Sequence, residues 1–225
     1  MDKKYKLTEE TINIEGKTLY RIEALKDFAN IKKGDKGGFV EKGDNLSHED
    51  DCWVYNNAKV YGNAWVCGNA AIYDDALVCD NAVVSDNAKV YSNAVVYGNA
   101  EVYGNAEVFD SAAIYDDALV CDNVEVYNNA RIYGYGEVYN NAVVRDNAEV
   151  YGNARIFDDV EIYGNAEVYG KAEVCENVEV YGDAKIYGNA RVYCDTEVYD
   201  KAEVCGYSKI YGNAVICGNM KVCRK

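Results

Sequence analysis

The chain repeats one pattern of apolar and polar positions with a period of six residues. From Val54 to Val222 every sixth residue is Val or Ile, which gives twenty-nine positions without an insertion. Two residues before each of these stands a small or apolar side chain, which is alanine in most repeats. Because side chains alternate between the two faces of a β-strand, both positions share one face, and we expect that face to point inward.

The residues between these positions predict a corner after each short strand. In most hexads a pair such as Gly-Asn, Asp-Asn, Asp-Asp or Asn-Asn occurs there. These residue types tolerate the left-handed backbone of a tight turn. A six-residue side cannot bury its apolar face alone, so successive sides must wrap and stack, and three sides make a triangular coil of about 18 residues.

The pattern therefore predicts an all-β fold built as a single parallel β-helix. Twenty-nine hexads make between nine and ten coils, and at roughly 4.8 Å per coil the rod would be about 46 Å long. The sequence contains no proline. This agrees with a fold in which nearly every backbone N–H is needed for pairing between coils.

Residues 1–50 lack the running period, and we expect them to form a small N-terminal cap on a β-helix of residues 51–225. In "TINIEGKTLYRI" apolar residues alternate around Glu15–Gly16, which predicts a hairpin. Val40 and Leu46 are six residues apart, which indicates an irregular first coil before a two-residue shift to Val54. A cap has a physical purpose here, because an open β-helix end exposes unpaired strand edges.

The combination of aliphatic residue, corner pair and small residue resembles the hexapeptide-repeat left-handed β-helix proteins. Within that class the "VYGNA" units and the lead-in "LYRIEALKDFANIKKGDKGGFVEKGDNLS" look like a group of bacterial and phage-type repeat proteins, mostly of unknown function. The resemblance extends over essentially the whole chain and implies left-handed coils. The class also contains enzymes, so the resemblance raises two possible activities. These are an acyltransferase that uses a histidine as general base and a carbonic anhydrase that binds zinc through three histidines.

The single histidine argues against both activities. His48 lies in "NLSHEDDCW", outside the regular repeats, so one chain cannot supply three histidines, and a lone general base would need a cleft shared with another subunit. The uninterrupted hexads also leave no room for the projecting loop that such acyltransferases usually carry. We therefore expect a non-catalytic protein with no cofactor and no metal, and keep an acyltransferase using His48 at an inter-subunit cleft as an alternative.

The cysteines and the paired aspartates do not form a convincing metal site. Nine cysteines without C-x-x-C spacing indicate unpaired thiols of a reducing compartment, so we expect a cytoplasmic location. Only Cys205 and Cys223, which are one coil apart in the sequence, would stack, and a disulfide or a two-thiolate metal contact is conceivable there. The pairs Asp74–Asp75, Asp116–Asp117 and Asp158–Asp159 recur every seven hexads. That is two coils plus one side, so a duplication explains them better than a calcium site does.

Overall charge excludes some partners. The chain has 23 basic and 38 acidic residues, a net charge of -15, so we expect no direct binding of nucleic acid. No segment approaches the roughly 18 consecutive apolar residues of a membrane span, so we expect no membrane insertion.

Two sets of outward positions are candidates for a binding surface. Glutamates stack on one side of the coils with only Val143 between them, and like charges about 4.8 Å apart repel unless a cation or a basic partner meets them. These are Glu107, Glu125, Glu161, Glu179 and Glu197. Apolar residues at the same position in the early repeats need a cover, which the cap, another copy or a foreign partner would supply. These are Trp53, Trp65, Leu77, Val83 and Val95.

Tyrosines add a third set, in vertical rows such as Tyr115, Tyr133, Tyr151, Tyr169 and Tyr187. Stacking between coils is their simplest interpretation; an aromatic strip for sugars is the alternative. We expect a scaffold or binding module whose acidic, tyrosine-lined faces meet a macromolecular partner, either another protein or further copies as a homo-oligomer or trimer. A self-assembling structural protein that stacks rod on rod is the second hypothesis.

Overall fold

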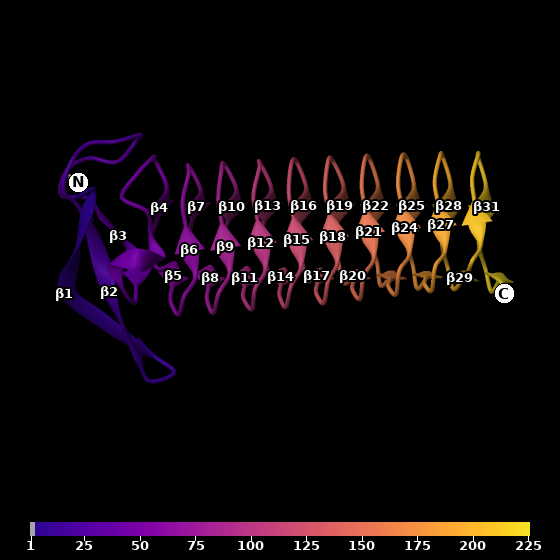
Figure 1. Ribbon diagram of the computed structural model, residues 1–225, viewed down its shortest axis with the longest axis horizontal. Coiled ribbons are helices and arrows are strands. Elements are labelled where there is room, and N and C mark those ends of the chain that lie inside the picture. The colour runs from indigo at the N-terminus through magenta and orange to yellow at the C-terminus, as the bar shows by residue number, and fades with distance from the viewer. Residues whose placement is uncertain (1–2) are drawn as a thin grey trace.

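The molecule is a rod of stacked coils with an N-terminal cap at one end (Figure 1). The computed structural model describes residues 3–225, and within them the only helical element is the 3-10 turn η1(Gly43–Asn45). None of the elements in this part of the chain is a helix long and apolar enough to cross a membrane. The predicted all-β fold is confirmed.

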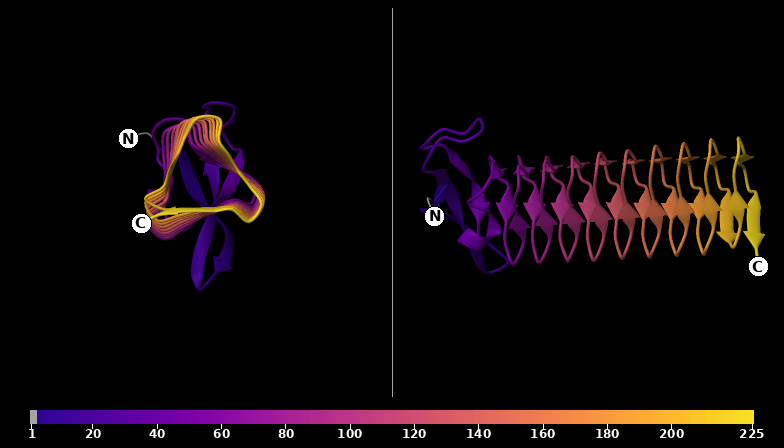
Figure 2. Two further views of the ribbon diagram at one scale, coloured as in Figure 1. Left: turned by 90° about the vertical axis from the view of Figure 1, so that its right-hand side faces the viewer. Right: turned by 45° about the horizontal axis from the view of Figure 1, so that its top comes forward.

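Three sheets form the three sides of the rod, because every third strand pairs with the one a coil away. The end view in Figure 2 shows the triangular cross-section. The 13-stranded sheet consists of β1(Tyr5–Ile14), β2(Lys17–Ala24), β3(Lys36–Val40), β5(Lys59–Val60), β8(Leu77–Val78), β11(Val95–Val96), β14(Ala113–Ile114), β17(Arg131–Ile132), β20(Glu149–Val150), β23(Glu167–Val168), β26(Lys185–Ile186), β29(Glu203–Gly206) and β32(Lys221–Arg224).

The other two sheets contain only short parallel strands. The 10-stranded sheet consists of β4(Trp53–Val54), β7(Ala71–Ile72), β10(Lys89–Val90), β13(Glu107–Val108), β16(Glu125–Val126), β19(Val143–Val144), β22(Glu161–Ile162), β25(Glu179–Val180), β28(Glu197–Val198) and β31(Val215–Ile216). The 9-stranded sheet consists of β6(Trp65–Val66), β9(Val83–Val84), β12(Glu101–Val102), β15(Leu119–Val120), β18(Glu137–Val138), β21(Arg155–Ile156), β24(Glu173–Val174), β27(Arg191–Val192) and β30(Lys209–Ile210).

The register between strands confirms the predicted length of one coil, which is three hexads. Lys89 pairs with Glu107, and Glu107 pairs with Glu125, each time at the same position of the repeat. The chain makes about ten such coils. The left hand that the resemblance implies stays a prediction, since strand pairing alone does not define it.

The core is one continuous column of small and aliphatic side chains. Every Val or Ile of the six-residue period from Val54 to Val204 is 0% exposed. Each such side chain contributes about 1.5–3 kcal/mol through burial. The alanines two residues earlier are also buried, and their small size lets the three sides approach closely.

The corners have the backbone that their sequence predicts. The first residue of the corner pair has a positive φ, as at Asp80 (60°), Gly98 (73°) and Asp116 (59°). The paired aspartates lie on three different corners, following β7, β14 and β21, as their spacing of seven hexads predicts.

The second corner residue builds side-chain ladders along the rod. Asn69 donates its amide hydrogen to Asn87 in the next coil, and the chain of bonds continues until it reaches Asp159. A second ladder starts at Asn63 and ends at Asp117. Each ladder stops at an aspartate because a carboxylate accepts a hydrogen bond but has no N–H to pass on.

The N-terminal segment closes one end of the core. β1 and β2 form the antiparallel hairpin predicted around Glu15–Gly16, and β3 joins β2 to β5. Val40 pairs with Val60, and Leu46 bridges Val66. Both steps are two residues longer than a regular coil, so the first coil has the two-residue irregularity that the sequence indicates.

A buried lysine anchors this segment to the first regular coil. The ammonium group of Lys4 donates to the backbone carbonyls of Glu49, Asp50 and Cys52 at 2.9–3.2 Å. Lys4 is 1% exposed, and a buried charge needs such partners. Tyr5 lies beside it, and its hydroxyl donates to the carbonyl of Leu46 at 2.8 Å.

Candidate binding face

The five stacked glutamates lie on the outward side of the 10-stranded sheet, one per strand. We call this surface the glutamate face; it consists of Glu107, Glu125, Glu161, Glu179 and Glu197. The first two are directly adjacent in register, and so are the last three. Val143 pairs with a glutamate on each side and separates the two groups.

Only two of these carboxylates have a positive partner within residues 3–225. Lys89 forms an ion pair with Glu107 at 2.8 Å, and Arg145 forms one with Glu161 at 3.3 Å. The bond from Lys89 lowers the pKa of the Glu107 carboxyl. In the same part of the chain, Glu125, Glu179 and Glu197 form no ion pair, and all three side chains are exposed.

Tyrosine hydroxyls partly replace the missing cations. Tyr163 donates to Glu179 at 3.0 Å, and Tyr181 donates to Glu197 at 3.3 Å. Desolvation and the neighbouring Glu197 carboxylate raise the pKa of Tyr181 to about 12. These phenols are therefore neutral donors at neutral pH, so the negative charge of the two carboxylates is not cancelled.

On the other two sides of the rod most outward glutamates are neutralised by ion pairs, including Glu149 and Glu167, which are direct neighbours. On the 13-stranded sheet the ion pairs are Arg131–Glu149 at 3.7 Å and Lys185–Glu167 at 2.7 Å. On the 9-stranded sheet they are Arg155–Glu137 at 3.2 Å, Arg155–Glu173 at 3.7 Å and Arg191–Glu173 at 3.0 Å. The glutamate face differs from both because three of its five carboxylates, those of Glu125, Glu179 and Glu197, form no ion pair within residues 3–225.

An aromatic row runs along the edge of the glutamate face. The rings of Tyr163, Tyr181 and Tyr199 stack with centroids 4.8–4.9 Å apart. Arg145 interrupts the row and lies over the Tyr163 ring, with the guanidinium carbon 4.0 Å from the ring centroid. Arg145 can be recognised in the sequence because it directly follows a core Val, a position that tyrosine occupies in most repeats.

The tyrosine row predicted on the next side is also formed. Tyr115, Tyr133, Tyr151, Tyr169 and Tyr187 stack at 4.8–5.0 Å. The rings are nearly parallel, and several hydroxyls donate to a glutamate 16 residues later, as Tyr151 does to Glu167 at 2.9 Å. These contacts support packing between coils as the role of the row.

The five apolar candidates do not form one surface, because they belong to three different sheets. Trp53 is 1% exposed and packs against Tyr5 and Phe28 of the cap. Leu77 packs in a cluster with Leu19 and other cap residues. The cap thus covers part of the set.

Of the remaining three apolar candidates, Val83 and Val95 are partly buried, as Leu77 is, and only Trp65 is exposed. Trp65 is 47% exposed and pairs with Val83 on the 9-stranded sheet. Val95 pairs with Leu77 on the 13-stranded sheet and is partly buried. The sequence alone could not separate these cases, because it does not show which coils the cap reaches.

His48 contributes to the cap. Its ring stacks on Tyr5 with centroids 4.3 Å apart, and its Nδ1 accepts the backbone N–H of Lys4 at 3.2 Å. Desolvation and the charges of nearby lysines lower the pKa of the imidazole, so the ring is neutral at pH 7. The use of His48 as a general base between subunits stays a prediction.

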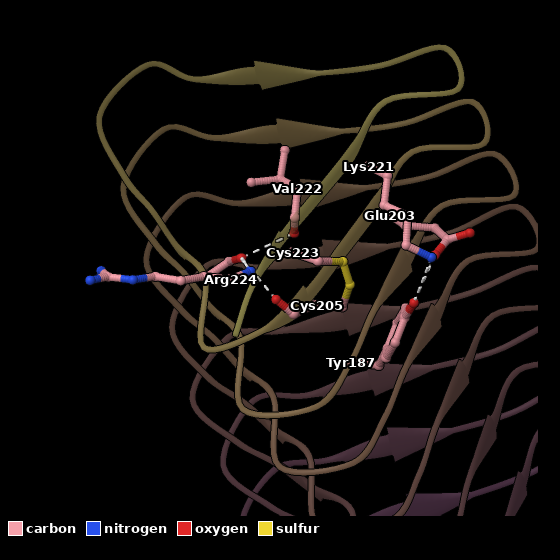
Figure 3. The surroundings of a disulfide bond; sticks show 8 residues. Tyr187, Glu203, Cys205, Lys221, Val222, Cys223 and Arg224 are labelled. Atoms are coloured by element: carbon pink, nitrogen blue, oxygen red, sulfur yellow. Dashed lines mark hydrogen bonds and ion pairs between the residues drawn. A yellow bond between two sulfur atoms is a disulfide. The ribbon is translucent and has the colours of Figure 1, made fainter.

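The structure corrects the expectation of unpaired thiols at one place. Cys205 and Cys223 form a disulfide between β29 and β32, with their Cα atoms 4.6 Å apart (Figure 3). The other seven cysteines are free. Among the described residues no group of three or more His, Cys, Asp or Glu side chains is arranged to hold a metal ion.

The comparisons with known proteins do not assign the chain to a family. Neither a protein-family model nor a curated protein sequence matches the chain.

Proposed function

We propose that the protein is a non-catalytic, rigid binding rod whose glutamate face docks a basic protein surface. One observation carries this proposal. At the same outward position of the repeat, five of the six glutamates on the other two sides form an ion pair, whereas only two of the five on the glutamate face do so within residues 3–225.

The physical argument is the cost of this arrangement. Like charges directly opposite one another on neighbouring strands destabilise a sheet, and each contact that a cationic partner supplies is worth roughly 0.2–1 kcal/mol at an exposed site. A basic partner that lies across several coils would relieve the repulsion and gain these contacts together. The rod's continuous core holds the backbone of this face in a fixed register, so binding would require little further ordering of the backbone.

The proposal is tested with a fluorescently labelled octalysine peptide. Its affinity for the protein is measured by fluorescence anisotropy at low and at physiological salt. We expect the triple variant Glu125→Gln/Glu179→Gln/Glu197→Gln to bind the peptide about tenfold more weakly, since three lost contacts of about 0.5 kcal/mol each together match the roughly 1.4 kcal/mol of a tenfold change. Glutamine keeps an oxygen that accepts the tyrosine hydroxyls, so the fold is preserved.

The matched control removes the same charge from another side. Glu101→Gln/Glu137→Gln/Glu173→Gln lies at the equivalent positions of the 9-stranded sheet and also changes the net charge by three. Under the proposal this variant keeps its affinity for octalysine. Equal weakening of both triple variants would mean that net charge alone attracts the peptide, and the glutamate face would lose its role.

A further inference from the structure

The aromatic row beside the glutamate face continues towards the cap, and it is interrupted there. The rings of Tyr55 and Tyr73 stack with centroids 4.3 Å apart, and those of Tyr91 and Phe109 stack at 4.9 Å. Between these two pairs, Tyr73 and Tyr91 form no stacked contact in the part of the chain that the structure describes. The two tyrosines directly follow β7 and β10, which are neighbours in the 10-stranded sheet (Figure 1).

Hydrogen bonds anchor the rings on the two sides of this gap to different parts of the molecule. The hydroxyl of Tyr55, on which Tyr73 stacks, donates to Oδ1 of Asn30 in the cap at 3.1 Å. The hydroxyl of Tyr91 instead donates to Glu107 in the following coil at 3.1 Å. A cavity of about 310 Å³, open to solvent, lies where the row is interrupted.

The cavity combines two aromatic rings with anchored charges. It is lined by Tyr73, Asp74, Lys89, Tyr91 and Glu107. The Asp74 carboxylate accepts the side-chain amide of Asn56 at 3.0 Å and the backbone N–H of Ser92 at 3.3 Å. Lys89 pairs with Glu107 at 2.8 Å, whereas Asp74 forms no ion pair within residues 3–225. The cavity therefore has one negative charge that no cation offsets.

The chain fills the equivalent space four coils later with a guanidinium group. Arg145 directly follows β19 and thus stands where Tyr73 stands after β7, four strands earlier in the same sheet. Its guanidinium carbon lies 4.0 Å from the centroid of the Tyr163 ring, and its Nη1 lies 3.3 Å from Oδ2 of Asp146. The repeat equivalents of these two contacts at the cavity are Tyr91 and Asp74.

One position differs between the two places. Glu161, which forms an ion pair with Arg145 at 3.3 Å, corresponds in the repeat to Lys89. Because Glu107 holds the Lys89 ammonium group, the charge of this lysine is offset. A cation that enters the cavity is then attracted by the Asp74 carboxylate and by the tyrosine rings.

From this correspondence we propose that the cavity binds an arginine side chain of the basic partner, with the guanidinium group over the Tyr91 ring and against the Asp74 carboxylate. The inference rests on the proposed function, and it adds an arginine anchor beside Glu107, at the end of the glutamate face nearest the cap. A planar guanidinium lies on an aromatic ring and still donates N–H groups to a carboxylate, whereas the ammonium of lysine is compact and strongly hydrated. The cavity should therefore select arginine over lysine.

The test compares two labelled peptides of equal charge by fluorescence anisotropy at physiological salt. One is octalysine, and in the other a single arginine replaces one central lysine. We expect the arginine peptide to bind the unmodified protein about fivefold more tightly, which is within the range that a cation over an aromatic ring contributes at an exposed site.

Two variants remove this preference in different ways. Asp74→Asn removes the charge and should make the two peptides bind equally. Asparagine tolerates the positive φ of 56° at this corner and keeps an oxygen for the N–H of Ser92, so the fold is preserved. Tyr73→Arg places a guanidinium of the chain itself at the position that Arg145 occupies, and it should also abolish the preference. Circular dichroism checks that both variants are folded.

Asp110→Asn is the matched control. Asp110 lies on the same corner two coils further along and accepts the backbone N–H of Asn128 at 3.3 Å. The neighbouring rings of Phe109 and Tyr127 stack at 4.8 Å, so the row is closed there. This variant loses the same charge as Asp74→Asn and should keep the fivefold preference of the unmodified protein.

Three results would overturn the arginine anchor. These are equal binding of both peptides to the unmodified protein, a preference that survives in Asp74→Asn or in folded Tyr73→Arg, and loss of the preference in Asp110→Asn. Failure of the proposed function is seen in a different measurement, the binding of octalysine to the two glutamine triple variants. The ratio of the two peptide affinities does not depend on that result, so the two proposals fail independently.

Discussion

At the scale of single residues, the corner aspartates serve two purposes. Asp116 has a φ of 59°, and its Oδ2 accepts the backbone N–H of Gly134, one coil further along, at 3.1 Å. The same bond recurs from Gly98 to Asp80, from Gly104 to Asp86 and from Gly164 to Asp146. Aspartate thus tolerates the left-handed backbone and also satisfies an N–H that the sheets leave unpaired.

This pairing predicts the outcome of two substitutions that remove the same charge. Asp116→Ala should destabilise the protein by about 2 kcal/mol, because alanine has roughly 1–2 kcal/mol of left-handed strain and the hydrogen bond of about 1 kcal/mol is lost. Asp116→Asn should stay within about 0.5 kcal/mol, since asparagine tolerates this backbone and keeps an acceptor oxygen. Urea unfolding followed by circular dichroism measures both; equal losses would show that the charge, and not the geometry, matters.

At the scale of elements, the tyrosine rows couple many ionisable groups to the stacked fold. Desolvation raises the pKa of Tyr55 to about 12, and a bond with Cys121 together with desolvation raises that of Tyr103 to about 12. The usual value is near 10. A tyrosine whose folded pKa is raised stabilises the fold fully below pH 10, and this contribution is lost as the pH rises from 10 through 12.

We therefore expect a plateau of stability up to about pH 10, followed by cooperative alkaline unfolding between about pH 10 and 12. Tyrosinate absorbance at 295 nm and circular dichroism should change together in this range. Gradual titration of all tyrosines near pH 10 with unchanged circular dichroism would contradict the role of these rows in packing.

How far the sequence predicts the structure differs between elements. The strict period predicts the short strands, the corners and the stacked rows, because every repeat meets the same packing problem. It does not predict the cage of carbonyls around Lys4, which comes from segments more than forty residues apart. The glutamate row could be predicted from its spacing of one coil, but the cations that neutralise the other two sides, such as Arg155, are recognised only when all three sides are compared.

The apolar candidates show the same limit. Trp53 and Trp65 occupy the same position of the repeat, yet one is buried and the other is 47% exposed. The difference depends on where the hairpin and the loop after it lie, and this part of the chain has no period from which to predict it.

At the scale of the whole molecule, the disulfide should control how the rod frays. The disulfide joins residues 18 apart in the sequence, and closing a loop of about this length is worth about 3 kcal/mol. Among residues 3–225, the coil that contains Cys223 pairs with a coil on one side only. In Cys205→Ser/Cys223→Ser we expect residues 207–225 to lose protection from amide hydrogen exchange, while residues 60–190 keep theirs.

Two free cysteines provide the control for this prediction. Cys67→Ser/Cys175→Ser changes two outward, unpaired thiols and should leave the exchange pattern unchanged. Loss of protection along the entire rod in the disulfide variant would mean that the coils do not open one at a time from the end.

The uniform core has a consequence for how such a chain can change through copying errors in its gene. All three sides bury the same pair of small and aliphatic residues, so gaining or losing one hexad leaves the packing intact. However, such a gain or loss moves every later outward side chain to a neighbouring side of the triangle. The segment "AAIYDDALVCDN" illustrates this: Leu77 of the first copy lies on the 13-stranded sheet, and Leu119 of the second lies on the 9-stranded sheet. Only changes by whole coils conserve a face. An aligned row from Glu107 to Glu197 is therefore the property that inheritance by duplication erases most easily, whereas the rod itself is the one it preserves.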